Sequence, residues 1–272
     1  MGKKGWVLLC SIFAAAVIGL QVYEVITTGI VDTHHLTRTV ILLATIVLVF
    51  LRKNSGFSDT RAIKKAYRRA YGELIGNAFE GKPALEKIFY AALHNLNNNK
   101  PNAALDKLED LQAECESIDE RFALAFFSGM CCDDLEQYES SVKHYERAAG
   151  FKRIISPLIN AGFGYSELGE FDRALECLQR AVDIKPDAVA YNNISQIYIE
   201  MQDYEKALEY ANLSIELNAV REDSLSAAAI CHAMLGHDDE YKEYLRRFVS
   251  AGGNADIVKR YIYMLKSADE QD

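Results

Sequence analysis

Residues 155–187 contain two successive helical patterns of apolar and polar positions, separated by the break Leu168-Gly169-Glu170. In each pattern the apolar side chains recur three or four positions apart, as in helices that bury one face. Gly162 and Ala174 leave room for two helices to approach closely, and Pro186 stands where a helix must stop. The segment therefore predicts a helical hairpin. Its landmark positions, which are small, aromatic, leucine or proline residues, are Ala161, Gly162, Tyr165, Gly169, Phe171, Ala174, Leu178, Ala181 and Pro186.

The same landmarks recur 33 residues away on both sides of this segment. Weaker copies occur near 222–250, with a break at Leu235-Gly236, and over 85–112, with a break at Asn97-Asn98-Asn99. A register held over several units predicts an array of stacked hairpins. The forward shift from Tyr165, Phe171, Ala174 and Ala181 gives Tyr198, Tyr204, Ala207 and Ser214, and the backward shift from Gly162, Phe171, Ala174 and Ala181 gives Gly129, Tyr138, Ser141 and Ala148.

This spacing resembles the tetratricopeptide repeat, whose period is about 34 residues with small, aromatic and proline landmarks at fixed offsets. The resemblance implies an all-α fold in which helical hairpins stack into a solenoid. A solenoid also needs a terminal helix with one polar face, and Ala255–Ser267 has that pattern. The predicted repeats are 85–121, 122–154, 155–187, 188–221 and 222–253, followed by a capping helix and tail over 254–272.

The resemblance further implies a concave groove lined by the first helix of each repeat. Asn160 and Asn193 occupy matching positions, where an amide can hydrogen-bond an extended peptide backbone or, alternatively, the neighbouring hairpin. Basic pairs that clamp a terminal carboxylate in some members are absent from these positions. We therefore expect the groove to bind an apolar or polar segment, or a helix. The predicted protein-binding groove comprises Phe126, Met130, Ile159, Asn160, Phe163, Asn192, Asn193 and Gln196.

Two apolar runs precede the repeats, and together they predict a hairpin of two transmembrane helices within residues 1–51. Trp6–Ile26 is long enough to cross about 30 Å of hydrocarbon as a helix. Leu36–Leu51 is shorter and carries Arg38 near its start. The alternative for the first run is a secretory signal peptide, since Lys3-Lys4 precede it.

Basic residues follow the second run, in a predicted juxtamembrane helix and linker over 52–84. The helix is expected over Ser58–Phe79, with several of the cations on one face that can lie along anionic headgroups. The alternative is a solvated outer face on a helix that caps the first repeat. The positive-inside rule places both termini and the repeat domain in the cytoplasm. The predicted membrane-surface residues are Arg52, Lys53, Arg61, Lys64, Lys65, Arg68 and Arg69.

Charge is distributed unevenly along the 272 residues. Residues 1–51 carry +1 and residues 52–69 carry +6, so residues 70–272 carry −16, because the whole chain carries −9. Phosphate binding needs the opposite sign over a large surface, so the charge disfavours a nucleic-acid partner.

The six cysteines contain no C-x-x-C pair, and four of them fall within predicted repeat helices. There cysteine acts as a small apolar side chain, which favours reduced structural thiols in a cytosolic setting. A redox switch at the vicinal Cys131-Cys132 is the alternative.

No pattern of catalytic or metal-binding residues is evident, and we predict neither an enzyme nor a cofactor. Gly162-x-Gly164 lacks a third glycine and follows no strand, and the histidines lack both H-E-x-x-H and clustered cysteines. His232 and His237 have poor spacing for a metal, and His34-His35 fit a solvated loop.

The sequence therefore predicts a non-enzymatic, membrane-tethered scaffold or adaptor that captures a protein or peptide in its groove. The alternative is a small membrane subunit of a transporter, channel or secretion assembly, in which the repeats form a docking arm.

Overall fold

The computed structural model describes residues 60–218 and 220–269, and the side chains within 64–218 and 220–267. The chain divides into two units, Met1–Ile63 and Lys64–Asp272, and the helices described below belong to the second unit from Lys64 onward. Both predicted transmembrane runs, together with Arg52 and Lys53, lie outside the described residues. Within the described residues, no helix combines the length and the apolar character needed to span a bilayer.

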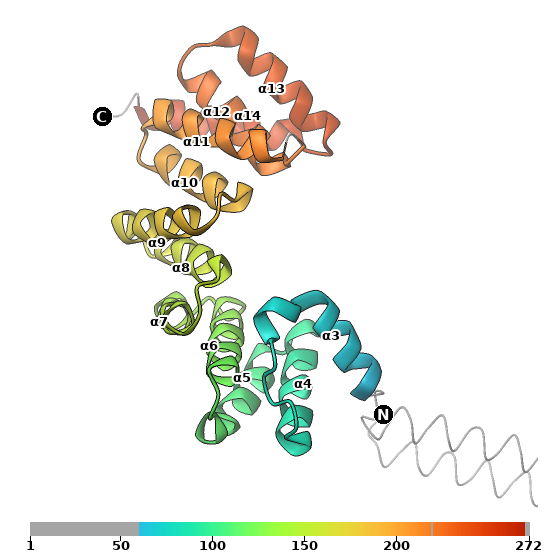
Figure 1. Cartoon of the computed structure of the whole chain (residues 1–272). Coiled ribbons are helices and arrows are strands. Elements are labelled where there is room, and N and C mark those ends of the chain that lie inside the picture. Colours follow the sequence, from blue (N-terminus) through green and yellow to red (C-terminus); the bar gives the residue numbers. More distant parts are fainter. Residues whose placement is uncertain (1–59, 219, 270–272) are drawn as a thin grey trace, which may run out of the picture. The chain divides into compact units, whose positions relative to one another are not determined.

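The described chain is all-α, without a strand in the described residues, which confirms the predicted fold class for the repeat region (Figure 1). From α4 to α13 the helices fall into pairs joined by short turns, with α3 before the first pair and α14 after the last one. Their bounds are α3 Thr60–Ile75, α4 Pro83–Asn97, α5 Pro101–Asp110, a 3-10 turn η1 Gln112–Glu114, α6 Ile118–Asp133, α7 Tyr138–Phe151, α8 Ile155–Glu167, α9 Phe171–Ile184, α10 Ala188–Glu200, α11 Tyr204–Leu217, α12 Glu222–Met234, α13 Asp238–Ser250 and α14 Ala255–Asp269.

Successive helices from α4 to α13 pack against one another, so each pair stacks on the next. The last helix, α14, packs on α12 and α13 at the carboxyl-terminal end. The first helices of neighbouring pairs also contact directly, α8 with α10 and α10 with α12. Each pair cannot bury its apolar stripe alone, which is why the stacking continues along the whole array.

The turns between paired helices share one backbone geometry. Asn99, Glu136, Gly169, Gln202 and Gly236 all have φ between 55° and 76°, in the left-handed region. The residue after each of them donates its N–H to a carbonyl five positions earlier, at 2.8–3.0 Å. This pattern closes the end of a helix and satisfies carbonyls that the helix leaves unpaired. Two of the five positions are glycine, which adopts this region without steric cost.

Close approach of the paired helices depends on small residues at the crossing. A Cβ added to Gly162 would lie 2.6 Å from Leu178 Cγ, and one added to Gly129 would lie 2.7 Å from Tyr145 Cε1. Leu178 and Tyr145 are fully buried. The small residue at this position of the repeat therefore makes room for a large buried side chain on the partner helix.

A capping box begins α6. Ser117 Oγ accepts from the Glu120 N–H at 3.1 Å, and Glu120 Oε2 accepts from the Ser117 N–H at 2.9 Å. Lys82 Nζ lies 2.9 Å from Glu120 Oε1. Burial raises the pKa of the Glu120 carboxyl. The N–H groups of Ser117 and Glu116 and the ammonium of Lys82 lower it by a larger amount, so the resulting pKa is about 2. Glu120 is therefore ionised over the physiological range and fixes the entry into α6.

The predicted helix Ser58–Phe79 is wrong in its carboxyl-terminal part, because α3 ends at Ile75 and is already non-helical at Tyr71. Gly76 takes a φ of 53°, and the Asn77 N–H donates to Asp119 Oδ2 at 2.8 Å. Asp119 also pairs with Lys152 at 2.6 Å. The Asp119 carboxylate, from a distant part of the chain, thus holds the backbone in a turn at residues where the sequence pattern had predicted helix.

Candidate protein-binding surface

The predicted groove residues lie on α6, α8 and α10, the first helices of three successive pairs. Their accessibility differs widely. Phe163 is 43% exposed, whereas Phe126, Asn192 and Ile159 are buried. Met130, Asn160, Asn193 and Gln196 are partly exposed. The structure therefore divides the predicted set into side chains that reach solvent and side chains that pack within the array.

Phe126 belongs to the core, which corrects the expectation that it lines an open groove. Its ring packs edge-on against Phe127 at 5.4 Å and tilts against Tyr145 at 5.7 Å, measured between centroids. Phe127 in turn meets Phe89 of α4 at 5.8 Å. Helix α6 is buried from Phe122 to Gly129, because α5 and α7 pack against it and Phe89 of α4 packs against Phe127. Such a helix has no free face there.

Asn160 lies next to the neighbouring hairpin. Its side chain is close to the hydroxyl of Tyr145 on α7, which donates to Asp133 Oδ2 at 2.6 Å. Burial, followed by the nearby Asp133 carboxylate, raises the pKa of Tyr145, so its hydroxyl stays protonated. Asn160 therefore lies beside the neighbouring hairpin and remains partly exposed.

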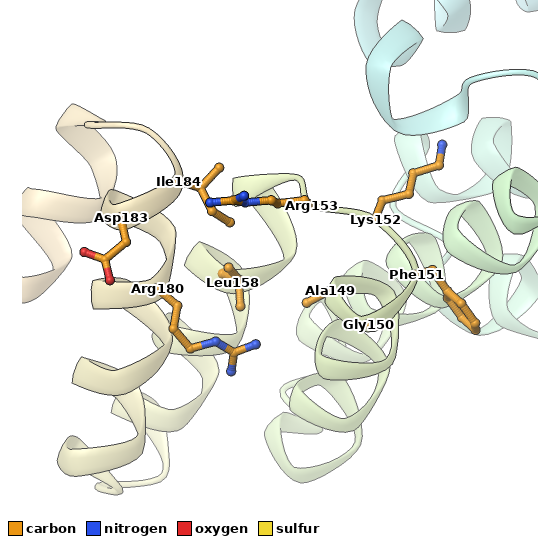
Figure 2. A pocket seen from close by; sticks show the side chains of 9 residues that line it. All are labelled: Ala149, Gly150, Phe151, Lys152, Arg153, Leu158, Arg180, Asp183 and Ile184. Carbon is orange, nitrogen blue, oxygen red and sulfur yellow. The ribbon is translucent and has the colours of Figure 1, made fainter.

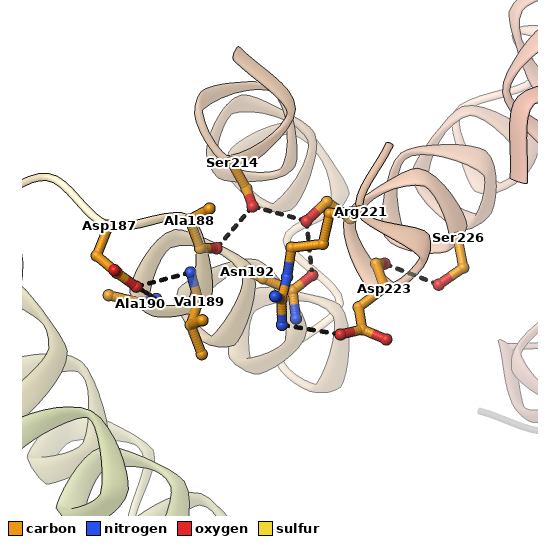
Figure 3. A network of polar contacts seen from close by, with 10 residues as sticks. Asp187, Ala188, Val189, Ala190, Asn192, Ser214, Arg221, Asp223 and Ser226 are labelled. Carbon is orange, nitrogen blue, oxygen red and sulfur yellow. Dashed lines mark hydrogen bonds and ion pairs between the residues drawn. The ribbon is translucent and has the colours of Figure 1, made fainter. Parts of the chain in front are cut away.

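Asn192 takes part in a polar network that joins α10, α11 and α12 (Figure 3). Ser214 donates to the carbonyl oxygen of Ala188 at 2.6 Å, and its oxygen lies 2.6 Å from Ser224 Oγ. Ser224 lies 3.3 Å from Asn192 Oδ1 as well. Asn192, Ser214 and Ser224 are all buried. The Asn192 amide is thus used between repeats, in agreement with the rule that buried polar groups are hydrogen-bonded.

The accessible part of the predicted set lies mainly on α8 and α10, which contact each other. The Phe163 ring meets Tyr138 edge-on at 6.2 Å and keeps much of its surface in solvent. Asn193 and Gln196 are partly exposed on α10. An exposed aromatic ring and, on the contacting helix, amides that donate and accept are groups well suited to contact another polypeptide. We call Phe163, Asn193 and Gln196 the α8–α10 face.

The predicted basic face of the juxtamembrane helix is divided between two environments. Lys64 pairs with Glu86 of α4. Arg68 Nε donates to the hydroxyl of Tyr90 at 3.1 Å, and its guanidinium lies 3.9 Å from Glu80. Lys65 and Arg69 are exposed, whereas the Arg61 side chain lies outside the described residues.

The cause of this division is the anchoring of α3. Tyr67 is buried and donates its hydroxyl to the carbonyl oxygen of Leu93 at 3.0 Å. Its neighbours Lys64 and Arg68 consequently turn toward α4. This corrects the expectation that all of these cations share one solvent-facing or membrane-facing surface.

The vicinal cysteines do not form a reactive pair. Cys131 and Cys132 are buried free thiols. Burial raises the pKa of Cys131 to about 12 and also raises that of Cys132. Since the thiolate is the reactive species, the structure favours the structural role over the redox switch.

The contact between His232 and His237 was not predicted from the sequence. Their Nδ1 atoms lie 3.3 Å apart across the turn between α12 and α13, and the His232 ring stacks on Tyr244 at 5.1 Å. Burial lowers the pKa of His232, with the proximity of His237 as the next cause. The left-handed turn at Gly236 folds the chain back and brings the two rings together.

Comparison with known proteins agrees with this architecture. The tetratricopeptide repeat family model matches residues 153–219. No curated protein matches by sequence. The crystal structure of MamA has a TM-score of 0.53 and 15% identity, covering 59% of this chain and 94% of that one.

Two further solved structures have the same fold. MamA from Desulfovibrio magneticus RS-1, from residue 41 to its end, has a TM-score of 0.51 and 16% identity, covering 65% of this chain and 96% of that one. A thermophilic TPR protein of Thermus thermophilus has a TM-score of 0.51 and 13% identity, covering 66% of this chain and 97% of that one. At these identities the likeness concerns the fold alone. The predicted resemblance to the tetratricopeptide repeat is confirmed at the level of the fold. The chain carries a helical solenoid of the tetratricopeptide repeat type, and residues 153–219 are the segment matched to that family.

Proposed function

We propose that this chain is a non-enzymatic adaptor that binds a segment of another protein on the α8–α10 face. The observation that carries the proposal is the exposure of Phe163, at 43%, in an array whose other large aromatic side chains on α6 and α8 are buried. The ring lies in solvent on α8, and two partly exposed amides, Asn193 and Gln196, lie on the contacting helix α10. Together they supply the apolar anchor and the polar contacts that protein interfaces combine.

The adaptor is proposed to be tethered to a membrane by the apolar runs Trp6–Ile26 and Leu36–Leu51, with the repeats on the cytoplasmic side. A tether confines the array near the bilayer and raises its effective concentration toward partners at the same membrane. In this arrangement the exposed cations Lys65 and Arg69 remain available to anionic headgroups, whereas Lys64 and Arg68 are engaged with α4.

Site-specific photocrosslinking in the full-length protein tests the interaction surface. A photoreactive side chain at Phe163 or Gln196 is expected to form the same discrete adduct, because both lie on contacting helices. Glu176, exposed on α9, is the control position. An adduct that forms equally from Glu176, or none from Phe163 and Gln196, would contradict the proposed face.

Protease digestion of sealed vesicles tests the tether and its orientation. In inside-out vesicles the repeat domain should be digested, and in right-side-out vesicles it should be protected. Extraction of the full-length protein by alkaline carbonate would exclude a membrane-spanning anchor, and digestion from the external side would exclude the proposed orientation.

A further inference from the structure

A pocket of about 420 Å³ lies where the carboxyl-terminal ends of α7 and α9 meet the beginning of α8 (Figure 2). It shares no lining residue with the α8–α10 face. The chain leaves α7 at Phe151 and runs in extended conformation at Lys152 and Ile154 before α8 begins. This short linker carries Arg153 along one edge of the pocket. The lining residues are Ala149, Gly150, Phe151, Lys152, Arg153, Leu158, Arg180, Asp183 and Ile184.

The floor of the pocket is apolar. Leu158 is 4% exposed, and Ala149 and Ile184 are partly buried beside it. Gly150 is exposed and adds no side chain to the lining. An aliphatic side chain entering here would cover apolar surface without displacing the protein's own groups.

Two arginines from separate elements border this floor. Arg153 of the linker and Arg180 of α9 are both exposed, and Figure 2 shows their guanidinium groups reaching along the pocket from α9 and the linker, with Leu158 between them. Lys152 is engaged elsewhere, since its Nζ lies 2.6 Å from Asp119 and 4.8 Å from the centre of the Phe122 ring. The one acidic lining residue, Asp183, accepts a hydrogen bond from Gln179 at 2.8 Å.

Charge identifies the kind of ligand that this pocket suits. Residues 70–272 carry −16 overall, yet the pocket places two arginines against one carboxylate. Guanidinium groups bind carboxylates with charge-assisted, often bidentate, hydrogen bonds. Asp183 reduces the local positive charge, which favours a singly charged carboxylate over a doubly charged phosphate.

We propose that this pocket binds an acidic segment of a partner protein, with a carboxylate between Arg153 and Arg180 and an adjacent aliphatic side chain on Leu158 and Ile184. This second docking site goes beyond the adaptor function proposed above and does not depend on the α8–α10 face. It also differs from the expectation for the groove, where the sequence indicated no affinity for acidic segments.

Fluorescence anisotropy with the full-length protein tests the site. The probe is a fluorescein-labelled peptide that alternates leucine and glutamate, compared with the same peptide carrying glutamine in place of glutamate. The acidic peptide should bind more tightly than the neutral one. Arg153→Gln and Arg180→Gln should each weaken its binding about tenfold, as expected for loss of a charge-assisted hydrogen bond.

Two further variants separate a specific site from general electrostatics. Lys143→Gln removes one exposed cation of α7 that does not line the pocket, and it should leave binding within about twofold. Asp183→Asn should strengthen binding of the acidic peptide, because it removes the one carboxylate of the pocket. A damaged fold would weaken binding, so an increase in affinity cannot come from misfolding. Thermal melting followed by circular dichroism checks that each variant is folded.

Several results would overturn the proposal. These are equal binding of both peptides, no arginine-dependent binding of the acidic peptide, or a loss in Lys143→Gln as large as in Arg153→Gln. Arginine-dependent binding of inorganic phosphate or phosphatidylserine vesicles in preference to the peptide would assign the pocket to a phosphate group or a lipid headgroup instead. If arginine-dependent peptide binding is absent but the crosslink at Phe163 still forms, the second docking site is refuted and the proposed adaptor function is not.

Discussion

Replacement of Gly162 by alanine measures how closely the paired helices approach. The added Cβ would lie 2.6 Å from Leu178 Cγ, 2.9 Å from its Cδ2 and 3.3 Å from the carbonyl oxygen of Ala174. The first contact is with the branching carbon of a buried side chain and the third is with backbone, so neither can easily move. Overpacking of this kind costs about 3 kcal/mol at its upper end. Alanine regains about 1 kcal/mol of helix propensity.

The net expectation is a loss of about 2 kcal/mol in the free energy of unfolding, measured by urea denaturation of the full-length protein. Gly150→Ala is the matched control, since that glycine lies within α7 and its Cβ would meet nothing within 4 Å. There the propensity gain is unopposed, and stability should stay unchanged or rise by up to about 1 kcal/mol.

A double-mutant cycle assigns the cost of the Gly162 substitution to its contact. Leu178→Ala alone should cost about 2–5 kcal/mol, because it leaves a cavity in the core. In that background the added Cβ no longer meets Leu178, so Gly162→Ala should be neutral or stabilising. An equal loss from Gly162→Ala in both backgrounds would refute the reasoning, because the cost would then arise from something other than the interhelical contact.

Three more predictions concern the turns, a buried carboxylate and the polar network. Glu136→Gly should stabilise the protein by about 1 kcal/mol in urea denaturation, because a left-handed φ of 57° strains a residue with a Cβ, whereas Gly169→Ala at the equivalent turn should destabilise it. The pKa of the Glu120 carboxyl is lowered to about 2 from 4.5. Its ionised form therefore stabilises the fold fully above pH 4.5, and this stabilisation is lost as the pH falls toward 2. In Glu120→Gln the urea concentration at the unfolding midpoint should decrease less between pH 4.5 and pH 2 than it does in the unsubstituted protein. Ser224→Ala should cost about 1–2 kcal/mol, because it removes a buried hydroxyl shared by Asn192 and Ser214, while Ser226→Ala, which loses one bond at a partly exposed site, should cost less.

The hairpin pattern could be predicted from the sequence because its main determinants are local. Apolar positions three and four apart mark the buried face of each helix, and the glycines at 169 and 236 mark two of the interhelix turns. The equivalent turns at Glu136 and Gln202 adopt the same backbone without glycine, so no residue type identified them. There the register of the neighbouring repeats, rather than the local residue, places the turn.

The binding surface could be predicted only in part, because exposure depends on side chains from other helices. The repeat pattern predicts that Phe126 and Phe163 both face the groove. Phe126 is covered by Phe127 and Tyr145. Phe163 contacts Tyr138 edge-on, and much of its ring remains exposed to solvent. The position of a residue within the repeat determines the direction in which its side chain leaves the helix. The packing of the next helix then determines whether that side chain reaches solvent.

The same distinction explains why the pocket bordered by Arg153 and Arg180 has no motif in the sequence. One arginine lies on the linker between two repeats and the other lies on the second helix of the following repeat, so only stacking brings them to one pocket. In a solenoid every boundary between repeats can create such a site, since the landmark residues hold the stack together and the remaining positions are free to vary. The α8–α10 face and the arginine pocket use residues from different helix ends, and a partner with one apolar segment and one acidic segment could engage both. If a single molecule spans both sites, Phe163→Ala and Arg180→Gln should each weaken its binding, and the double variant should lose both contributions. A partner whose affinity falls in only one of the two variants would instead assign the two surfaces to separate interactions.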